Sequence, residues 1–318
     1  MEITMESKHS IKAVVNRTGI SPYLIRAWER RYNAVTPDRT PTNRRLYTDR
    51  DIEKLTLLYK ATLRGESIGQ IANLSIKGIK ELLGDGSLSD KPISYPSKHT
   101  VLEKKEIIDK YIELVKNLNR EGLYRILFEA ETSFSKPVLL SDIILPILDR
   151  IGDEWQDGSL KTVHEHLASA VLRSFLGELL LVNKSSETAP GILSTTLTGQ
   201  LHEFGSIITT LSAIYEGWRG IYLGPNLPAD EIASVTKQSG IKVIALSFVY
   251  PADDPLLSKE IQKLRRLVGH DVHIIAGGRM VINYAAKLEE INAYIANNID
   301  SFRDILREIR TSSKRHNL

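Results

Sequence analysis

The sequence predicts a multidomain α and α/β protein with three parts: a winged helix-turn-helix head, a four-helix bundle, and a doubly wound parallel sheet of the flavodoxin-like kind. A length of 318 residues leaves room for two or three domains with separate cores. Two stretches rich in small and polar residues, 84–100 and 183–190, break the chain. After residue 190 the apolar pattern changes from helical to alternating strands and helices. The predicted domains are the head at 1–83, a linker at 84–100, the bundle at 101–184 and the α/β domain at 190–318.

The composition excludes several classes of protein. There is no cysteine, so disulfides, zinc fingers, iron–sulfur clusters and thiol catalysis are ruled out. The net charge of +3 and the 42% of apolar residues argue against a histone-like polycation and against wholesale disorder. No apolar run approaches a membrane span, and residues 1–10 lack the apolar core of a signal peptide. We therefore expect a cytoplasmic protein without a membrane partner.

Local signals define the elements of the head. Ser10 predicts the N-cap of a helix that Gly19 closes, and Ser21-Pro22 predicts the start of a second helix. The segment 39–47 contains a proline that excludes helix and predicts a hairpin or wing. Thr48, followed three residues later by Asp51, predicts the start of a further helix.

Positive charge is concentrated in the head. Residues 1–91 carry a net charge of +5, and six arginines but only two acidic residues lie between positions 21 and 47. On the helix that begins at Pro22, Tyr23, Arg26 and Arg30 share one face, while Leu24 and Trp28 share another and are predicted to pack inward. A solvated charged helix is the alternative interpretation. The succession of helix, turn, helix, basic wing and helix favours a DNA-binding surface, in which the wing arginines contact phosphates.

The middle of the chain predicts helices and few strands. Apolar residues recur at helical spacing over 101–118, over 138–155 with a kink expected at Pro146, and over 163–182. We expect four helices in this segment, which form a small bundle.

The last third predicts a parallel sheet. Short apolar runs alternate with helical stretches, and ligands in such sheets bind beyond the carboxyl ends of the strands. The predicted strands are 192–197, 220–223, 243–248, 272–276 and 292–295, and the predicted helices are 204–217, 228–239, 255–268, 280–288 and 298–312. His202 lies on the loop after the first strand, and imidazole is the commonest nitrogen ligand of transition metals.

The head resembles a known family. The stretch ISPYLIRAWERRY…RTPTNRRLYTDRDI is similar to the DNA-binding head of MerR-type transcription regulators over residues 9–80. The resemblance implies a homodimer or higher oligomer on pseudo-palindromic, double-stranded promoter DNA. The residues that it places at DNA are Tyr23, Arg26, Arg30, Arg39, Arg44, Arg45 and Tyr47.

The last third resembles cobalamin-binding domains. Their pattern D-x-H-x-x-G, S-x-L, G-G is matched around His202 and Gly205, by Ser247 and Val249 after 41 residues, and by Gly277-Gly278 after 27 more. The resemblance implies adenosylcobalamin as cofactor, with His202 as the lower cobalt ligand. Ser247 contacts the nucleotide tail, and the two glycines line its slot. Gln200 stands where the family has an aspartate that orients the histidine, so weaker binding is expected, and Gln200→Asp should tighten it.

The bundle resembles that of light-sensing, cobalamin-binding MerR-type repressors of carotenoid synthesis genes. Trp155, followed after nine residues by Glu165-His166, matches their W-x9-E-H arrangement, which implies contacts with the upper face of the cofactor. A buried tryptophan followed by a polar helix start is the alternative interpretation. The triplet at 164–166 makes a poor metal chelate, because adjacent helical side chains diverge. Gln156 stands where some light-sensing members carry a histidine, so light sensing does not follow from the match.

These features predict a cobalamin-responsive transcription regulator, a repressor and not an enzyme. One alternative is a cobalamin-independent MerR-type regulator whose C-terminal part serves oligomerisation or partner binding. The other is a corrinoid-carrying methyltransferase module, against which the DNA-binding head argues.

Overall fold

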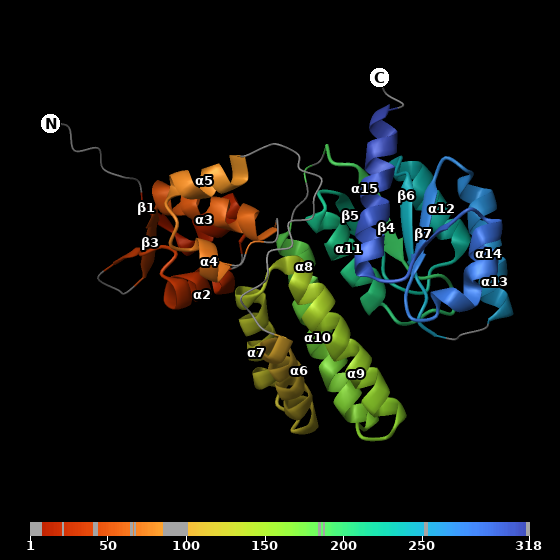
Figure 1. Ribbon diagram of the computed structural model, residues 1–318, viewed down its shortest axis with the longest axis horizontal. Helices are drawn as coiled ribbons and strands as arrows, with labels where there is room; N and C mark the ends of the chain where they lie inside the picture. Colours follow the sequence, from red (N-terminus) through yellow and green to blue (C-terminus); the bar gives the residue numbers. More distant parts are fainter. Residues whose placement is uncertain are drawn as a thin grey trace. The chain divides into compact units, whose positions relative to one another are not determined.

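A computed structural model describes residues 8–315 except 21, 41–43, 64–65, 67, 85–100, 184–185, 187 and 251–253. The chain divides into two compact units, residues 1–175 and 176–318, so the head and most of the bundle share one unit (Figure 1). The linker at 84–100, apart from Gly84, lies outside the described residues. Among the described residues, none of the helices combines the length and the apolar character that crossing a bilayer requires.

The head is helical with a small antiparallel sheet in the order β1-β3-β2. Its elements are β1 (Lys8–Ser10), α1 (Ile11–Thr18), α2 (Pro22–Tyr32), β2 (Asp38–Arg39), β3 (Arg45–Thr48), α3 (Asp49–Leu63), α4 (Ile68–Ile71) and α5 (Ile76–Gly84). The expected caps are present: the Ser10 hydroxyl accepts the N–H of Ala13, and Gly19 ends α1 at φ 72°. Thr48 and Asp51 bond each other's backbone N–H as a capping box.

The head encloses a core of its own. Trp28 and Tyr59 pack with their ring centroids 6.5 Å apart, and the buried residues around them all belong to the head. The wing predicted at 39–47 is the β2–β3 hairpin, in which Arg39 pairs with Arg45; its tip at 41–43 lies outside the described residues.

The bundle contains four helical rods, as expected. Its elements are α6 (Val101–Lys116), α7 (Arg120–Ser133), the rod made of α8 (Lys136–Val138), the π-helical turn η1 (Leu139–Ile144) and α9 (Leu145–Gln156), and α10 (Thr162–Val182). The helix α7 is the one that the apolar spacing had not located. Pro146 sits at the start of α9, directly after η1, because proline has no N–H to continue the hydrogen-bond ladder and a wider turn accommodates it.

The second unit contains a five-stranded parallel sheet in the order β5-β4-β6-β7-β8. Its strands are β4 (Gly191–Thr195), β5 (Arg219–Tyr222), β6 (Val243–Ser247), β7 (His273–Gly277) and β8 (Tyr294–Ala296). Its helices are α11 (Phe204–Tyr215), α12 (Ala229–Ser239), α13 (Pro255–Val268), the 3-10 turn η2 (Val281–Tyr284) with α14 (Ala285–Glu290), and α15 (Ile299–Arg315). This is the doubly wound, flavodoxin-like order that the alternation predicted.

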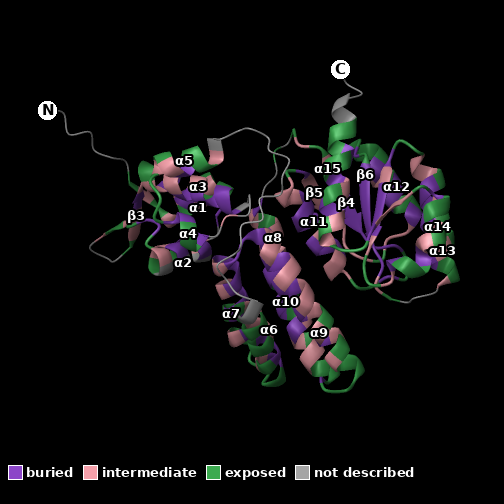
Figure 2. Ribbon diagram, in the orientation of Figure 1, coloured by how far each residue is buried: buried purple, intermediate pink, exposed green. Residues whose placement is uncertain are grey.

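Helices cover both faces of this sheet. One core cluster joins the strands to α12, α13 and α14, and the other joins them to α11 and α15. Every residue of the central strand β6 is buried (Figure 2), as expected for a parallel strand covered on both faces. The strand order reverses between β4 and β6, so a ligand crevice is expected at the carboxyl ends of these strands.

Candidate DNA interface and cofactor site

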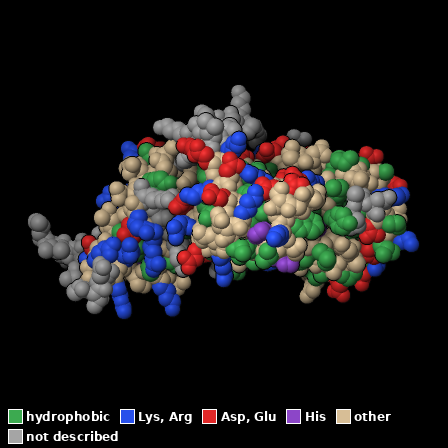
Figure 3. All heavy atoms as spheres, turned by 90° about the horizontal axis from the view of Figure 1, so that it is seen from below, with side chains coloured by type: hydrophobic (Ala, Val, Ile, Leu, Met, Phe, Trp, Pro, Cys, Tyr) green, Lys and Arg blue, Asp and Glu red, His purple; other side chains and the backbone are tan. Residues whose placement is uncertain are grey.

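The exposed face of α2 carries the predicted arginines. Arg26 and Arg30 are exposed, while Leu24 and Trp28 on the other face are buried, as predicted. Their spacing of four residues places the two side chains on one face, and the Nε of Arg30 donates to the backbone oxygen of Arg26 at 3.4 Å. The Tyr23 side chain lies outside the described residues. Figure 3 shows Lys and Arg side chains gathered on the head.

The wing arginines are held by an acidic residue of α2. The Nε of Arg45 donates to the carboxylate of Glu29 at 2.6 Å, and Arg39 lies 3.8 Å from the same carboxylate. This hydrogen bond raises the pKa of Arg45 above its ordinary value. Arg44 is exposed, and its backbone N–H donates to the Thr40 hydroxyl at 3.0 Å. Glu29 therefore connects the wing to α2. The sequence did contain a signal for this role, because Glu29 is one of only two acidic residues among six arginines between positions 21 and 47.

Tyr47 differs from the other residues that the resemblance placed at DNA. Its side chain is 0% exposed, and its hydroxyl has no hydrogen-bond partner among the described residues. Burial raises the pKa of Tyr47 to about 12. The assignment of Tyr47 to the DNA-facing surface is corrected on this ground: alternation along β3 turns its ring into the head core, so it supports the wing from inside.

The residues predicted at the upper face of a cofactor lie on two helices of the first unit. Trp155, at the end of α9, is half exposed, and its indole Nε1 donates to the Thr162 hydroxyl at 3.5 Å. The Glu165 carboxylate accepts a bond from Ser169 at 2.5 Å and lies 3.6 Å from the exposed imidazole of His166. Trp155 is thus not a core residue, and its ring is accessible to a ligand.

The His-Glu-His triplet at 164–166 does not form a metal site. His164 accepts the N–H of Lys161 through Nδ1 and so takes part in the first turn of α10. Over the described parts of the chain, no three His, Asp or Glu side chains are grouped so that they could hold a metal ion.

In the second unit, the fold brings the predicted glycines and Ser247 together at the carboxyl edge of the sheet. Gly205, at the start of α11, lies so close to Ser247 that a Cβ on the glycine would be 2.2 Å from the Ser247 hydroxyl oxygen. Ser247 pairs in register with Gly277, and a Cβ on Gly278 (φ 104°) would lie 2.4 Å from the carbonyl of Phe248. Only glycine permits these approaches.

Gln200 is a loop anchor. It is 1% exposed, and its side-chain oxygen accepts the N–H groups of Val249 at 3.1 Å and Tyr250 at 3.4 Å. It therefore ties the loop after β4 to the loop after β6 and does not orient His202.

The imidazole of His202 is exposed and stands edge to face with Tyr250, with ring centroids 6.5 Å apart. Tyr250 had not been singled out from the sequence, although an aromatic residue just after the S-x-V match was available as a signal.

The chemistry of this edge fits a cobalamin. The Ser247 hydroxyl and the Gln200 side-chain nitrogen are buried and have no hydrogen-bond partner in the part of the chain that the structure describes, so both could bond a polar ligand. The imidazole of His202 makes no hydrogen bond with the described residues, which leaves a ring nitrogen free for a metal. Gly205, Gly277 and Gly278 carry no side chains, so the backbone beside these groups leaves space for a bulky ligand.

Comparison with known proteins agrees with both parts of this picture. A family profile described as "MerR HTH family regulatory protein" matches residues 9–85, and one described as "B12 binding domain" matches residues 107–180. The HTH-type transcriptional repressor CarH of Myxococcus xanthus is 25% identical over 295 residues, covering 91% of this chain and 95% of that protein. The repressor CarA of the same organism is 23% identical over 306 residues, covering 96% of this chain and 98% of that protein.

A solved structure supports the fold of the bundle and sheet. The monomethylamine corrinoid protein of Methanosarcina barkeri superposes with a TM-score of 0.54 at 17% identity, covering 65% of this chain and 99% of that one.

The head and the bundle therefore define a protein with a MerR-type helix-turn-helix domain and a B12-binding-type domain. Over nearly its whole length the chain is a homologue of the repressors CarH and CarA.

Proposed function

We propose that this protein is a DNA-binding transcription regulator, a repressor, whose DNA affinity or oligomeric state responds to bound cobalamin. The proposal that the protein binds cobalamin rests on the arrangement at the carboxyl edge of the sheet, where the Ser247 hydroxyl, unpartnered among the described residues, faces Gly205. The proposal that it binds DNA rests on the head, and the homologous repressors support the combination of the two activities in one chain.

On the DNA side, Arg26 and Arg30 lie on the exposed face of α2, the helix that enters the major groove in helix-turn-helix proteins. Arg39 and Arg44 lie on the exposed wing, where their guanidinium groups would bind phosphate. Arg45 has one N–H engaged by Glu29 and would contact phosphate through those that remain. A homodimer or higher oligomer would present two heads to the two halves of a promoter site.

On the cofactor side, we favour adenosylcobalamin. The cofactor supplies a cobalt ion whose lower axial position takes an imidazole nitrogen. His202 would provide that nitrogen, with Tyr250 against its ring, and the Ser247 hydroxyl would bond the nucleotide tail beside Gly277-Gly278. In the first unit, Trp155, Glu165 and His166 would meet the upper ligand, since the Trp155 ring and the His166 imidazole are both open to it.

The first unit also offers a path from the cofactor to DNA. In it, α2 and α4 contact α7, and α3 contacts α8. The Tyr32 hydroxyl at the end of α2 donates to the backbone oxygen of Thr132 in α7 at 3.2 Å. A change in bundle packing on cofactor binding would therefore move the head as well.

The test is reconstitution of the full-length protein with adenosylcobalamin in the dark. We expect co-elution with the cofactor and a change in its visible spectrum as His202 binds cobalt, together with a change in affinity for promoter DNA. His202→Ala should abolish the spectral change. His270→Ala, which removes another exposed histidine of the same unit, is the matched control and should preserve it. Illumination of the complex, followed by a second DNA titration, tests whether light takes part although residue 156 is glutamine.

One specific observation favours a second candidate. The oxygen of Gln200 is engaged by the loop after β6 and is not available to polarise His202. The second candidate is therefore a cobalamin-independent MerR-type regulator whose second unit serves oligomerisation. If no cobalamin co-elutes with the wild-type protein while promoter binding is intact, this candidate replaces the first.

A further inference from the structure

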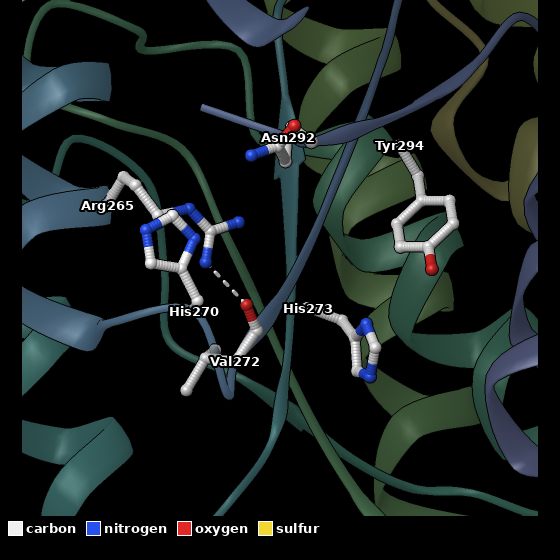
Figure 4. Close-up of a pocket in the computed structure, with 7 residues that line it drawn as sticks. Arg265, His270, Val272, His273, Asn292 and Tyr294 are labelled. Carbon is white, nitrogen blue, oxygen red and sulfur yellow. Dashed lines mark hydrogen bonds between the residues drawn. The ribbon is translucent and has the colours of Figure 1, made fainter. Parts of the chain in front are cut away.

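A second cavity lies at the other edge of the sheet, where β7 and β8 begin. Its volume is about 270 Å³, and it is formed by the end of α13, the segment before β7 and the turn before β8 (Figure 4). The lining residues are Arg265, His270, Val272, His273, Asn292, Ala293 and Tyr294. Ligands of doubly wound sheets bind at the carboxyl ends of the strands, so this cavity is separate from the site described above.

Arg265 is the chemical centre of this cavity. It is only 7% exposed, and three of its five N–H groups bond backbone oxygens: Nε to Ile291 at 2.8 Å, and Nη1 to Gly269 at 2.6 Å and Val272 at 2.7 Å. These bonds staple the end of α13 to the two loops. The Nη2 group has no hydrogen-bond partner among the described residues, although its side chain lines the cavity.

Among the described residues, the Arg265 guanidinium has no acidic partner. Burial lowers its pKa below the ordinary value, and no carboxylate opposes that shift. The pKa of His273 is likewise lowered, first by burial and then by the positive charge of Arg265. Among the described residues, neither Glu260 nor Asp271, the acidic residues nearest to Arg265 in the sequence, forms an ion pair with Arg265; Glu260 lies 3.7 Å from Lys263 instead. Buried charges in proteins are usually paired with an opposite charge. Here the three backbone carbonyls that bond Arg265 compensate its positive charge only in part.

The rest of the lining supplies further donors. The side chains of His270 and Asn292 are exposed and make no hydrogen bond with the described residues, and the ring of His273 lies beside that of Tyr294 with centroids 5.9 Å apart (Figure 4). No acidic side chain lines the cavity. Its volume is below the roughly 300–1,000 Å³ of pockets for drug-sized ligands, so it suits a small molecule.

We propose that this cavity binds a small anion, a phosphate or a short carboxylate, which completes the coordination of the Arg265 guanidinium. The Nη2 group would donate to an anion oxygen, and the Asn292 amide and the imidazoles of His270 and His273 would contact the remaining oxygens. The site serves as a second ligand site in the unit, independent of whether cobalamin binds.

The experiment is isothermal titration calorimetry of the cobalamin-free full-length protein with inorganic phosphate and, separately, with succinate. We expect saturable, one-to-one binding of at least one of them, and the tighter of the two identifies the anion class. His270→Glu adds a negative charge at an exposed lining position and should weaken binding at least about tenfold. Asn292→Gly removes the amide but permits the local φ of 51°, and should weaken binding by a smaller factor.

Lys259→Gln is the matched control, because it makes the same change in net charge at an exposed position on α13 that does not line the cavity. It should leave the affinity within about twofold. Absence of saturable binding for both anions, or equal loss of affinity in the His270 and Lys259 variants, would overturn the proposal and leave Arg265 as a structural staple. Since no cobalamin is added, neither result bears on the cofactor proposal.

Discussion

At the scale of single residues, the DNA-facing surface of the head depends on Glu29. Its carboxylate is shared by Arg45 and Arg39, so an acidic side chain positions two basic ones. Glu29→Ala raises the net charge of the head by one, which by long-range attraction alone should tighten DNA binding. We expect weaker binding, by about threefold or more, because the wing arginines lose their anchor.

Asp38→Asn provides the matched control for this prediction. This substitution makes the same change in net charge, but Asp38 lies in β2 of the wing and its partner is the exposed Lys8. Fluorescence anisotropy on a promoter duplex should show equal or tighter binding for this variant. Tighter binding by both variants would refute a positioning role for Glu29.

Tyr47 leads to a prediction about stability. Because its buried hydroxyl has no partner, Tyr47→Phe should raise the free energy of unfolding by about 1 kcal/mol and leave DNA affinity unchanged. In the wild type the pKa rises from 10.0 to about 12 on folding. Between pH 10 and pH 12 the Tyr47 hydroxyl therefore stays protonated in the folded state and loses its proton in the unfolded chain. The free energy of unfolding should fall as the pH rises through this range. Urea melts of both proteins across that range measure the effect; a smaller alkaline loss is expected for the phenylalanine variant.

At the scale of elements, the end of α7 and the start of α8 meet the head around a buried ion pair. Lys136, 2% exposed, donates to Glu131 at 2.7 Å. Helix α8, which carries Lys136, contacts α3, which carries Tyr59 of the head core. Burial and then the charge of Glu131 raise the pKa of Tyr59. Lys136→Met should destabilise the protein by about 3 kcal/mol, because it leaves a buried carboxylate unpaired.

The double variant Glu131→Leu/Lys136→Met should recover most of that loss, since an apolar pair needs no desolvation of charge. Denaturant unfolding measures both. Lys104→Met breaks the partly exposed pair with Asp142 and, as the control, should cost less than about 1 kcal/mol. A double variant no more stable than Lys136→Met would show that the pair acts through something other than charge burial.

At the scale of the whole molecule, the head has its own core but is too small to present two DNA-reading surfaces alone. We expect a fragment of residues 1–91 to fold, to sediment as a monomer and to bind promoter DNA more weakly than the full chain. Sedimentation velocity and anisotropy titrations on both proteins test this. A stably dimeric fragment would place the oligomer contacts in the head instead of residues 92–318.

The sequence alone determined the order of the domains and most of their elements, α7 excepted, because the signals for them are local. Ser10, Gly19 and the Thr48–Asp51 box define helix ends within a few residues, and the alternating apolar runs after residue 190 define the parallel sheet. The spacing of His202, Ser247 and Gly277, through the resemblance to cobalamin-binding domains, predicted which edge of the sheet would bind the cofactor. The structure brings Ser247 and Gly277 together at that edge, where the carboxyl ends of the parallel strands meet.

Only the tertiary structure decided what individual side chains do within that frame. Tyr47 is buried in the head core, and the side chain of Gln200 bonds the backbone of a loop about 50 residues away. Arg265 donates to backbone carbonyls of two loops. Periodicity says which face of an element is apolar, but it does not say which distant backbone group a polar side chain will reach. Those partners are set by long-range packing, and burial then makes each unsatisfied or unpaired group costly enough to matter for function.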